Sequence, residues 1–229
     1  MHMTSSRGRR GQQRGLSLIE LMVGIAVGLF IVAGASKLLV DNLVNNRRLL
    51  VETRVNQDLR VAADLMARDL RRAGYWQNAE RGVYYKNGPT AVTVNQYAAA
   101  SSAPSASEAR YAYAKDAVDA LAVAEQFGFK LESSILKSWD GASNAWRDVT
   151  DGETTLITAF NVALVEQASI DLTVYCQPVG CSAAGCPALQ IGGFEITLTG
   201  RAKSDANVVR TLREEVRIRN DRIQGACAS

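Results

Sequence analysis

The chain of 229 residues has room for one folded domain of moderate size and an additional elongated segment. Hydrophobic residues make up 47% and charged residues 21%, so most of the chain can fold and bury a core. The net charge of +3 comes from residues 1–15, which hold four arginines and no acid; the remainder has 22 basic and 23 acidic side chains. The basic charge therefore belongs to one terminal segment, which argues against a basic face that binds nucleic acid.

The only histidine, His2, lies in the same terminal segment. Without that segment the chain would lack both the usual general base and the commonest metal ligand. The sequence contains no P-loop, dinucleotide-binding, G-x-S-x-G or EF-hand motif. Asp116, Asp119, Asp148 and Asp151 have the ordinary spacing of turns and strand starts rather than that of a calcium site. We therefore expect neither an enzyme nor a metal or other cofactor.

Residues 16–40 (LSLIELMVGIAVGLFIVAGASKLLV) contain an uncharged stretch over 21–36. With its flanks, the segment reaches the roughly 20 residues that span a bilayer. The arginines before it should stay cytoplasmic, so that the carboxyl side is exported. An ordinary secretory signal would need a small-residue cleavage site after the apolar stretch. A plain signal anchor leaves Glu20 unexplained, because a carboxylate there costs about 2.5–3.5 kcal/mol on insertion scales.

The string Arg14-Gly15-Leu16-Ser17-Leu18-Ile19-Glu20 accounts for both ends of this segment. It resembles the class III signal of type IV prepilins, in which a basic leader ends in Gly and an apolar helix follows with Glu at its fifth position. The resemblance implies that a membrane peptidase cleaves between Gly15 and Leu16 and methylates the new amino terminus. It also implies that Glu20 pairs with a neighbouring subunit's terminal ammonium and guides docking. Leu16 is a departure, since the family most often has Phe or Met there.

The helical pattern continues to about Ala73, and Gly74 predicts the helix stop. Apolar residues recur at three- and four-residue spacing, which predicts an amphipathic helix over 41–73. These residues are Val51, Val55, Leu59, Ala62, Leu65, Met66, Leu70 and Ala73. Charges of opposite sign four residues apart, such as Arg60/Asp64 and Asp64/Arg68, predict ion pairs on the exposed side. The apolar stripe needs a folded domain to pack on.

Three further segments resemble PilW-like minor pilins. Residues 66–75 (MARDLRRAGY) are similar to the D-L-R-x-A-G-Y segment typical of that family. Residues 216–220 (VRIRN) resemble its closing strand, and residues 119–123 (DALAV) resemble an internal strand that begins with Asp. The resemblance implies an α+β type IV pilin fold, in which the outer half of a long amino-terminal helix packs on an antiparallel β-sheet.

Beyond Gly74 the pattern changes to short β-like runs separated by turn residues. The predicted strands are 91–97, 117–124, 156–163, 169–175, 189–199 and 208–218. Residues 98–109 (AAASSAPSASEA) are predicted to form a low-complexity surface loop. The dipeptides Asp140-Gly141 and Asp151-Gly152 predict turns. Trp139 and Trp146 flank the first turn; they suit either a ligand-binding surface or hairpin and core packing, and we expect packing.

The four cysteines, Cys176, Cys181, Cys186 and Cys227, all lie in the exported part. Their spacing differs from the paired C-x-x-C of a zinc site, and an oxidising periplasm favours two disulfides. Three pairings are open. We favour one bridge within the 176–186 loop and a second that ties Cys227 to that loop.

These features predict four parts: a cleaved leader (1–15), a transmembrane and filament-core half-helix (16–40), an amphipathic outer half (41–73) and a periplasmic β-rich domain (74–229). The resemblance implies a minor pilin that primes or caps a type IV pilus by protein–protein docking and supports twitching motility and adhesion. It implies the other minor pilins, the major pilin, the prepilin peptidase and a tip adhesin as partners, without direct binding of nucleic acid.

Before assembly the chain would cross the inner membrane once, and after assembly it would lie at the tip or base of a pilus. Two alternatives stay open. A minor pseudopilin of a type II secretion system shares the signal and the helix. A membrane-anchored periplasmic binding module would require only an uncut anchor.

Overall fold

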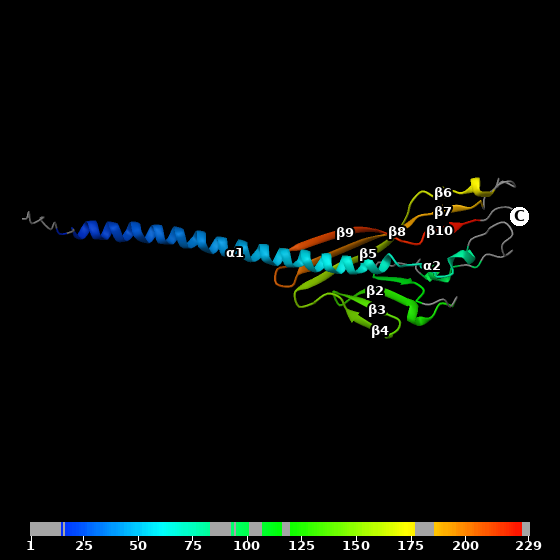
Figure 1. The fold of residues 1–229 in the computed structure, drawn as a ribbon. Helices are drawn as coiled ribbons and strands as arrows, with labels where there is room; N and C mark the ends of the chain where they lie inside the picture. The colour runs from blue at the N-terminus through cyan, green and yellow to red at the C-terminus, as the bar shows by residue number, and fades with distance from the viewer. Residues whose placement is uncertain are drawn as a thin grey trace, which may run out of the picture. The chain divides into compact units, whose positions relative to one another are not determined.

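The structure is a computed structural model that describes residues 15, 17–82, 93, 95–100, 107–115, 120–176 and 186–225. A long helix, α1 (Leu18–Leu70), is followed by antiparallel strands and short helices (Figure 1). This arrangement confirms the predicted α+β fold class. The chain divides into two compact units, Met1–Leu49 and Leu50–Ser229, and each is described by itself.

The first unit contains the amino-terminal part of α1. The amide of Leu21 donates a hydrogen bond of 3.1 Å to the carbonyl of Ser17, which begins the helical ladder. Every described residue of this unit is exposed. By length and composition, the apolar stretch of this helix is sufficient to cross a membrane.

The part of α1 within the second unit has one buried face. The buried residues follow the predicted three- and four-residue spacing, and they are Val55, Leu59, Ala62, Ala63, Met66, Ala67 and Leu70. Leu65 was predicted to belong to this stripe but is 41% exposed, because its neighbour Met66 occupies the buried position. The small alanines in the stripe let the strands approach the helix closely.

The helix ends at Leu70, three residues before the predicted end at Ala73. The amides of Arg72 and Ala73 donate to carbonyls three residues back, at 3.0 Å each, so the chain tightens from α to 3₁₀ geometry. Gly74 then has a φ of 71°, a left-handed conformation that glycine adopts without steric cost. The predicted stop at Gly74 is therefore confirmed.

In the described ranges of the second unit, the strands form three antiparallel sheets. The four-stranded sheet has the order β1-β2-β3-β4, with β1 Glu108–Ala112, β2 Gln126–Glu132, β3 Ile135–Asp140 and β4 Ala145–Asp148. A three-stranded sheet has the order β5-β8-β9, with β5 Thr155–Glu166, β8 Gly192–Ala202 and β9 Val209–Arg217. A small sheet has the order β10-β7-β6, with β10 Arg222–Gln224, β7 Ala188–Gln190 and β6 Ile170–Asp171.

Short helical segments connect these strands. They are the helix α2 (Gln96–Ala100) and the 3₁₀ helices Ala79–Gly82, Val123–Glu125 and Thr173–Cys176.

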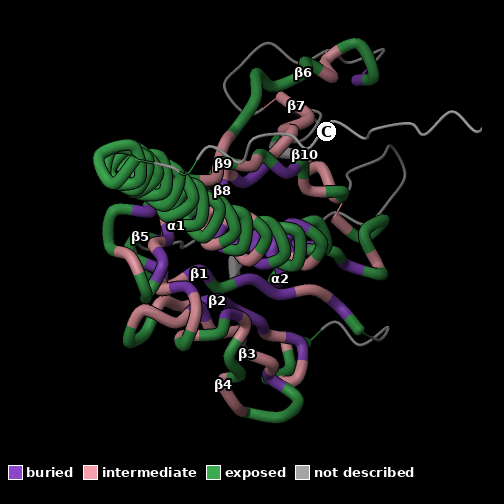
Figure 2. The backbone as a smooth tube through the Cα atoms, turned by 90° about the vertical axis from the view of Figure 1, so that its left-hand side faces the viewer, coloured by how far each residue is buried: buried purple, intermediate pink, exposed green. Residues whose placement is uncertain are grey.

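One hydrophobic core joins α1 to the two larger sheets. It contains Met66 and Leu70 from α1, Phe129 from β2, and Phe194 and Leu198 from β8. Figure 2 shows buried residues along β1, β2 and β8. Helix and strand approach each other closely at Gly200 of β8, where a Cβ atom would lie 3.1 Å from Cδ2 of Leu59. Glycine at this position therefore allows the helix to pack directly on β8.

The longer strands of the second unit agree with the sequence prediction. Predicted strands 156–163 and 208–218 correspond to β5 and β9, while 189–199 corresponds to β7 and β8, separated at Ile191. Within 169–175 only β6 is extended. Asp171 Oδ1 accepts a hydrogen bond of 2.8 Å from the Thr173 amide, which turns the chain into a 3₁₀ helix.

Predicted strand 91–97 is wrong where it is described, because Gln96 and Tyr97 begin α2. Asn95 caps this helix, as its Oδ1 accepts hydrogen bonds of 3.0 and 3.2 Å from the amides of Tyr97 and Ala98. The predicted loop 98–109 is also corrected, since α2 extends to Ala100 and β1 begins at Glu108. Residues 91, 92, 94 and 101–106 lie outside the described residues.

Predicted strand 117–124 is likewise not a strand over its described residues, 120–124. Val123 begins a 3₁₀ helix, and Glu125 Oε2 accepts a hydrogen bond of 3.1 Å from the amide of Ala122. Residues 116–119 lie outside the described residues. This side-chain cap favours a helical turn over an extended chain.

Strands β1 to β4 were not predicted, but the two turns near them were. Asp140-Gly141 leads from β3 into the turn before β4, and Asp151-Gly152 lies in the turn before β5. Trp139 and Trp146 are direct partners in the β3–β4 hairpin, with ring centroids 5.5 Å apart. The Arg110 guanidinium lies 5.5 and 5.4 Å from these two centroids. The two tryptophans therefore pack within the hairpin, as expected.

Candidate functional site

The residues of the predicted signal lie at the amino terminus of the first unit. Gly15 is exposed and precedes α1, while Leu16 lies outside the described residues. Glu20 is exposed in the first turn of α1, where the partial positive charge of a helix amino terminus favours a carboxylate. Large apolar side chains surround it in the sequence and are exposed, such as Phe30 at 81%. Such a helix requires cover from lipid or from other apolar helices.

The motif predicted at 66–75 lies where α1 ends against β1, and we call this region the helix-end joint. The phenol of Tyr111 on β1 donates a hydrogen bond to the carboxylate of Asp69. Arg72 Nη1 donates to the hydroxyl of Tyr113 at 3.4 Å, and its guanidinium lies 5.7 Å from the centre of that ring. Two charged residues of the motif thus bind two tyrosines that are two residues apart on the chain.

Burial sets the protonation of this joint. It raises the pKa of Asp69, an effect that the hydrogen bond from Tyr111 and the charge of Arg72 partly offset. Burial also raises the pKa of Tyr111 well above its ordinary value, and the nearby Asp69 carboxylate adds to the increase. Tyr111 therefore remains a protonated hydrogen-bond donor. The arrangement fixes the helix end rather than preparing a reactive group.

Backbone hydrogen bonds complete the joint on the β1 side. The amide of Gly74 donates to the carbonyl of Ala112 at 2.9 Å, and the amide of Ala114 donates to the carbonyl of Tyr75 at 2.9 Å. Asn95 Nδ2 donates to the Gly74 carbonyl at 2.9 Å. The chain that leaves α1 is therefore bonded on both sides of Gly74.

The closing segment 216–220 meets the same joint. Val216 is buried at the end of β9, and the amide of Arg219 donates a hydrogen bond of 3.1 Å to the carbonyl of Arg71. This bond satisfies one of the carbonyls that a helix leaves unpaired at its carboxyl end. The two segments that carry the family resemblance at 66–75 and 216–220 are thus hydrogen-bonded to each other.

The third segment that carries the family resemblance, 119–123, packs on a separate small cluster of buried residues. Asp119 lies outside the described residues, and Leu121 packs on the small cluster that contains Trp76 and Tyr97. Glu125, which the sequence did not single out, is 3% exposed. Its carboxylate accepts hydrogen bonds of 2.9 Å from the Tyr97 hydroxyl and 2.8 Å from the Lys115 amide. Glu125 is a single acid within an apolar stretch, and no sequence pattern indicates that its carboxylate is buried and accepts hydrogen bonds.

The cysteines are described in part. Cys176 is buried at the end of a 3₁₀ helix, and both Cys176 and Cys186 form disulfide bonds. Cys181 and Cys227 lie outside the described residues. The pairing favoured from the sequence stays a prediction.

Two family models match the chain. The model described as prepilin peptidase-dependent protein B matches residues 48–218, and the prokaryotic N-terminal methylation motif matches residues 10–36. No curated protein and no solved structure matches it. The first match includes the helix-end joint and the second includes Gly15 and Glu20. The long amino-terminal helix and antiparallel sheets are consistent with the type IV pilin fold. The chain is a type IV pilin-like protein that belongs to the prepilin peptidase-dependent protein B family.

Proposed function

We propose that this protein is a PilW-like minor pilin, which primes or caps a type IV pilus by docking to other subunits and catalyses no reaction. The observation that carries this proposal is the position of Glu20. It is the acidic residue in the first turn of an exposed apolar helix, five residues after the glycine that ends the basic leader. A carboxylate in such a segment is costly in lipid and therefore points to a partner.

In the proposed mechanism, prepilin peptidase cleaves between Gly15 and Leu16 and methylates the new amino terminus. Residues 16–40 anchor the chain in the inner membrane by a single span, and residues 41–73 and 74–229 lie on the periplasmic side. When the helix moves into a filament, the Glu20 carboxylate pairs with the terminal ammonium of a neighbouring subunit. The pairing neutralises both charges and selects the docking register.

The resemblance at 66–75 and 216–220 supports the assignment to a pilus, and these two segments share the hydrogen bond from Arg219 to Arg71. The partners are the other minor pilins, the major pilin and a tip adhesin. Twitching motility and adhesion depend on the filament and so depend on this chain indirectly. Two disulfides, one within 176–186 and one to Cys227, would stabilise the carboxyl-terminal region in the oxidising periplasm.

Mass spectrometry of the mature amino terminus tests the processing step. In cells with the dedicated peptidase, the purified protein should begin with N-methyl-leucine at position 16. A catalytically inactive peptidase provides the control and should leave the leader attached. A chain that keeps its leader in cells with active peptidase would overturn the proposal.

The substitution Glu20→Gln tests the docking step, because it removes the charge and keeps the size of the side chain. The variant should be processed normally but should be reduced in sheared filament fractions. Ser36→Ala, a polar change in the same apolar stretch, serves as the matched control and should be incorporated like the wild type. Normal incorporation of Glu20→Gln would contradict the docking role.

A further inference from the structure

The charged side chains of α1 within the second unit are sorted by sign. Three of the four acids between residues 50 and 72 bind the sheets. Glu52 forms an ion pair with Arg210 of β9. Asp58 accepts a hydrogen bond from the hydroxyl of Thr155 at the start of β5, and Asp69 accepts one from Tyr111 of β1. The acids of the helix therefore mostly face its own domain.

The arginines lie on the opposite, exposed side of the helix. All five arginines between residues 50 and 72 are exposed, and they are Arg54, Arg60, Arg68, Arg71 and Arg72. Arg72 contacts Tyr113. For the other four, the described part of the chain supplies no side-chain hydrogen bond or ion pair. The ion pairs predicted for Asp64 with Arg60 and Arg68 are thus not formed among the described residues.

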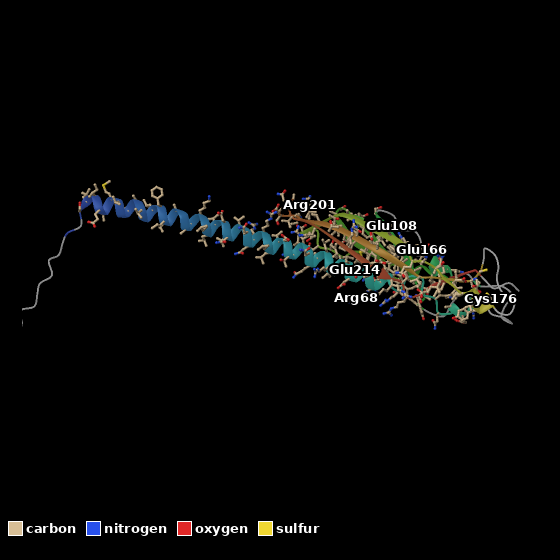
Figure 3. The ribbon with its side chains drawn as sticks, turned by 90° about the horizontal axis from the view of Figure 1, so that it is seen from above. Arg68, Glu108, Glu166, Cys176, Arg201 and Glu214 are labelled. Atoms are coloured by element: carbon tan, nitrogen blue, oxygen red, sulfur yellow. The ribbon has the colours of Figure 1, made fainter. Side chains whose placement is uncertain are left out.

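Two apolar side chains lie between these arginines. Val61 is 67% exposed and Leu65 is 41% exposed, and they are one helical turn apart. We call the surface formed by Arg54, Arg60, Val61, Asp64, Leu65, Arg68 and Arg71 the arginine face. It extends from Arg54 to the end of α1 at Leu70 and includes the adjacent Arg71; the 17 helical residues span about 26 Å at 1.5 Å per residue. Figure 3 labels Arg68 on this part of α1.

We propose that the arginine face is a docking surface for an acidic surface on another subunit of the same filament. The face carries four guanidinium groups that form no ion pair or side-chain hydrogen bond with the described residues, and it carries one exposed carboxylate. It is therefore complementary to a surface rich in Asp and Glu. Arginine is also the charged residue most enriched in protein interfaces. The proposal rests on the proposed function, because it assumes that the chain enters a filament.

The apolar residues decide between classes of partner. A nucleic acid backbone or lipid headgroups would also offer negative charge. Against a nucleic acid, Val61 and Leu65 would lie against charged phosphates and lose water without gaining apolar contact. Against a membrane, two apolar side chains bury little area, and membrane binding of a helix scales with buried apolar area. A protein surface supplies both the acids and the apolar contact. The observations therefore favour a protein partner.

Photocrosslinking in cells that assemble filaments tests this proposal. The full-length chain carries p-benzoylphenylalanine at position 61, and a control chain carries it at Thr197 on the outer face of β8. Position 61 should crosslink to a second protein with an amino-terminal methylation signal, at a segment rich in Asp and Glu. The same product should be absent from the Thr197 chain.

Charge reversal supplies the decisive comparison. Arg60→Glu with Arg68→Glu should lower the yield of that product about ten-fold, because like charges then face each other. Arg147→Glu with Arg213→Glu, two exposed arginines on β4 and β9, makes the same change in net charge and should leave the yield unchanged. Changing the crosslinked acids of the partner to Lys should restore the yield for the first double variant.

Three outcomes would overturn the inference: equal yields from both double variants, crosslinks from position 61 to lipid or nucleic acid alone, or no crosslink from a chain that enters filaments. The proposed function fails separately, through an unprocessed leader or normal incorporation of Glu20→Gln. A processed and incorporated chain that shows any of the three outcomes would therefore refute only the docking surface.

Discussion

The helix α1 has two parts that obtain cover for their apolar side chains in different ways. From Leu18 to Leu49 every residue is exposed, and the apolar residues occupy all sides of the helix. From Leu50 onward apolar residues recur with helical spacing, and one face is buried in the core of the second unit. Continuous apolar sequence thus marks a segment whose cover lies outside the chain, and periodic apolar sequence marks one that is covered by its own domain.

The largest effect is expected when an alanine is changed to aspartate in each of the two parts of α1. Ala63→Asp puts a carboxylate into the buried stripe, which should lower the free energy of unfolding of the second unit by about 3–5 kcal/mol. Ala33→Asp should leave that free energy unchanged and should reduce retention in membranes. Chemical denaturation of the detergent-solubilised chain and membrane fractionation measure the two effects. Equal unfolding free energies for the two variants would contradict the distinction.

A smaller effect comes from two glycines that differ in their surroundings. At Gly200 a Cβ atom would lie 3.1 Å from Leu59 and 3.3 Å from Thr155, whereas at Gly28 no neighbouring atom of a described residue would lie within 4 Å. Gly200→Val should therefore cost about 1–3 kcal/mol through overpacking. Gly28→Val should not change the unfolding of the second unit. Thermal unfolding of both variants measures the difference, and a wild-type midpoint for Gly200→Val would show that α1 and β8 are not tightly packed there.

The smallest effect concerns the pH dependence of stability at the helix-end joint. Because burial raises the pKa of Asp69, the folded state favours the protonated carboxyl. The contribution of protonated Asp69 to the stability of the folded state is full at pH values below the pKa of an ordinary aspartate. It is lost as the pH rises through the raised pKa of Asp69. The wild type should therefore lose stability relative to Asp69→Asn as the pH rises from acidic values. Tyr111→Phe removes the hydrogen bond that lowers this pKa, and it should steepen the dependence. Parallel pH profiles for all three proteins would contradict this account.

The parts of the fold that were predicted carry strong local signals. The helix, its stop at Gly74 and the turns at Gly141 and Gly152 follow from periodicity and from glycine. Strand β8 has one buried face and alternates regularly over 194–199. Strands β5 and β9 were predicted from their β-like composition between turn residues. These elements could be predicted from the local sequence, without knowledge of contacts between distant segments.

Strands β1 to β4 were not predicted, although β1 and β2 alternate between inward and outward residues. Tyr111, Phe127 and Phe129 are buried, while Arg110 and Lys130 lie on the outward face. Trp139 and Trp146 lie on that face and are covered by Arg110, while Lys130 lies 4.4 Å from the ring centre of Trp146. These two tryptophans interrupt the alternation in the β3–β4 hairpin, whereas the alternation of β1 and β2 is present in the sequence. The helix-end joint depends on contacts between distant segments. The resemblance located residues 66–75 and 216–220. The structure adds that these segments meet, because the Arg219 amide donates a hydrogen bond to the Arg71 carbonyl.

The late position of β8 and β9 in the chain has a consequence for folding during synthesis. The helix stripe that ends at Leu70 is covered by β8 and β9, whose residues are synthesised more than a hundred positions later. At 5–20 residues per second, that interval is roughly 6–25 s, during which the stripe lacks the cover that β8 and β9 provide. A chain truncated before β8 would leave the part of the helix that β8 and β9 cover exposed, and it should be a substrate for quality-control proteases. Folding of this domain therefore waits for nearly the last strand to be synthesised, even though its first element is complete early.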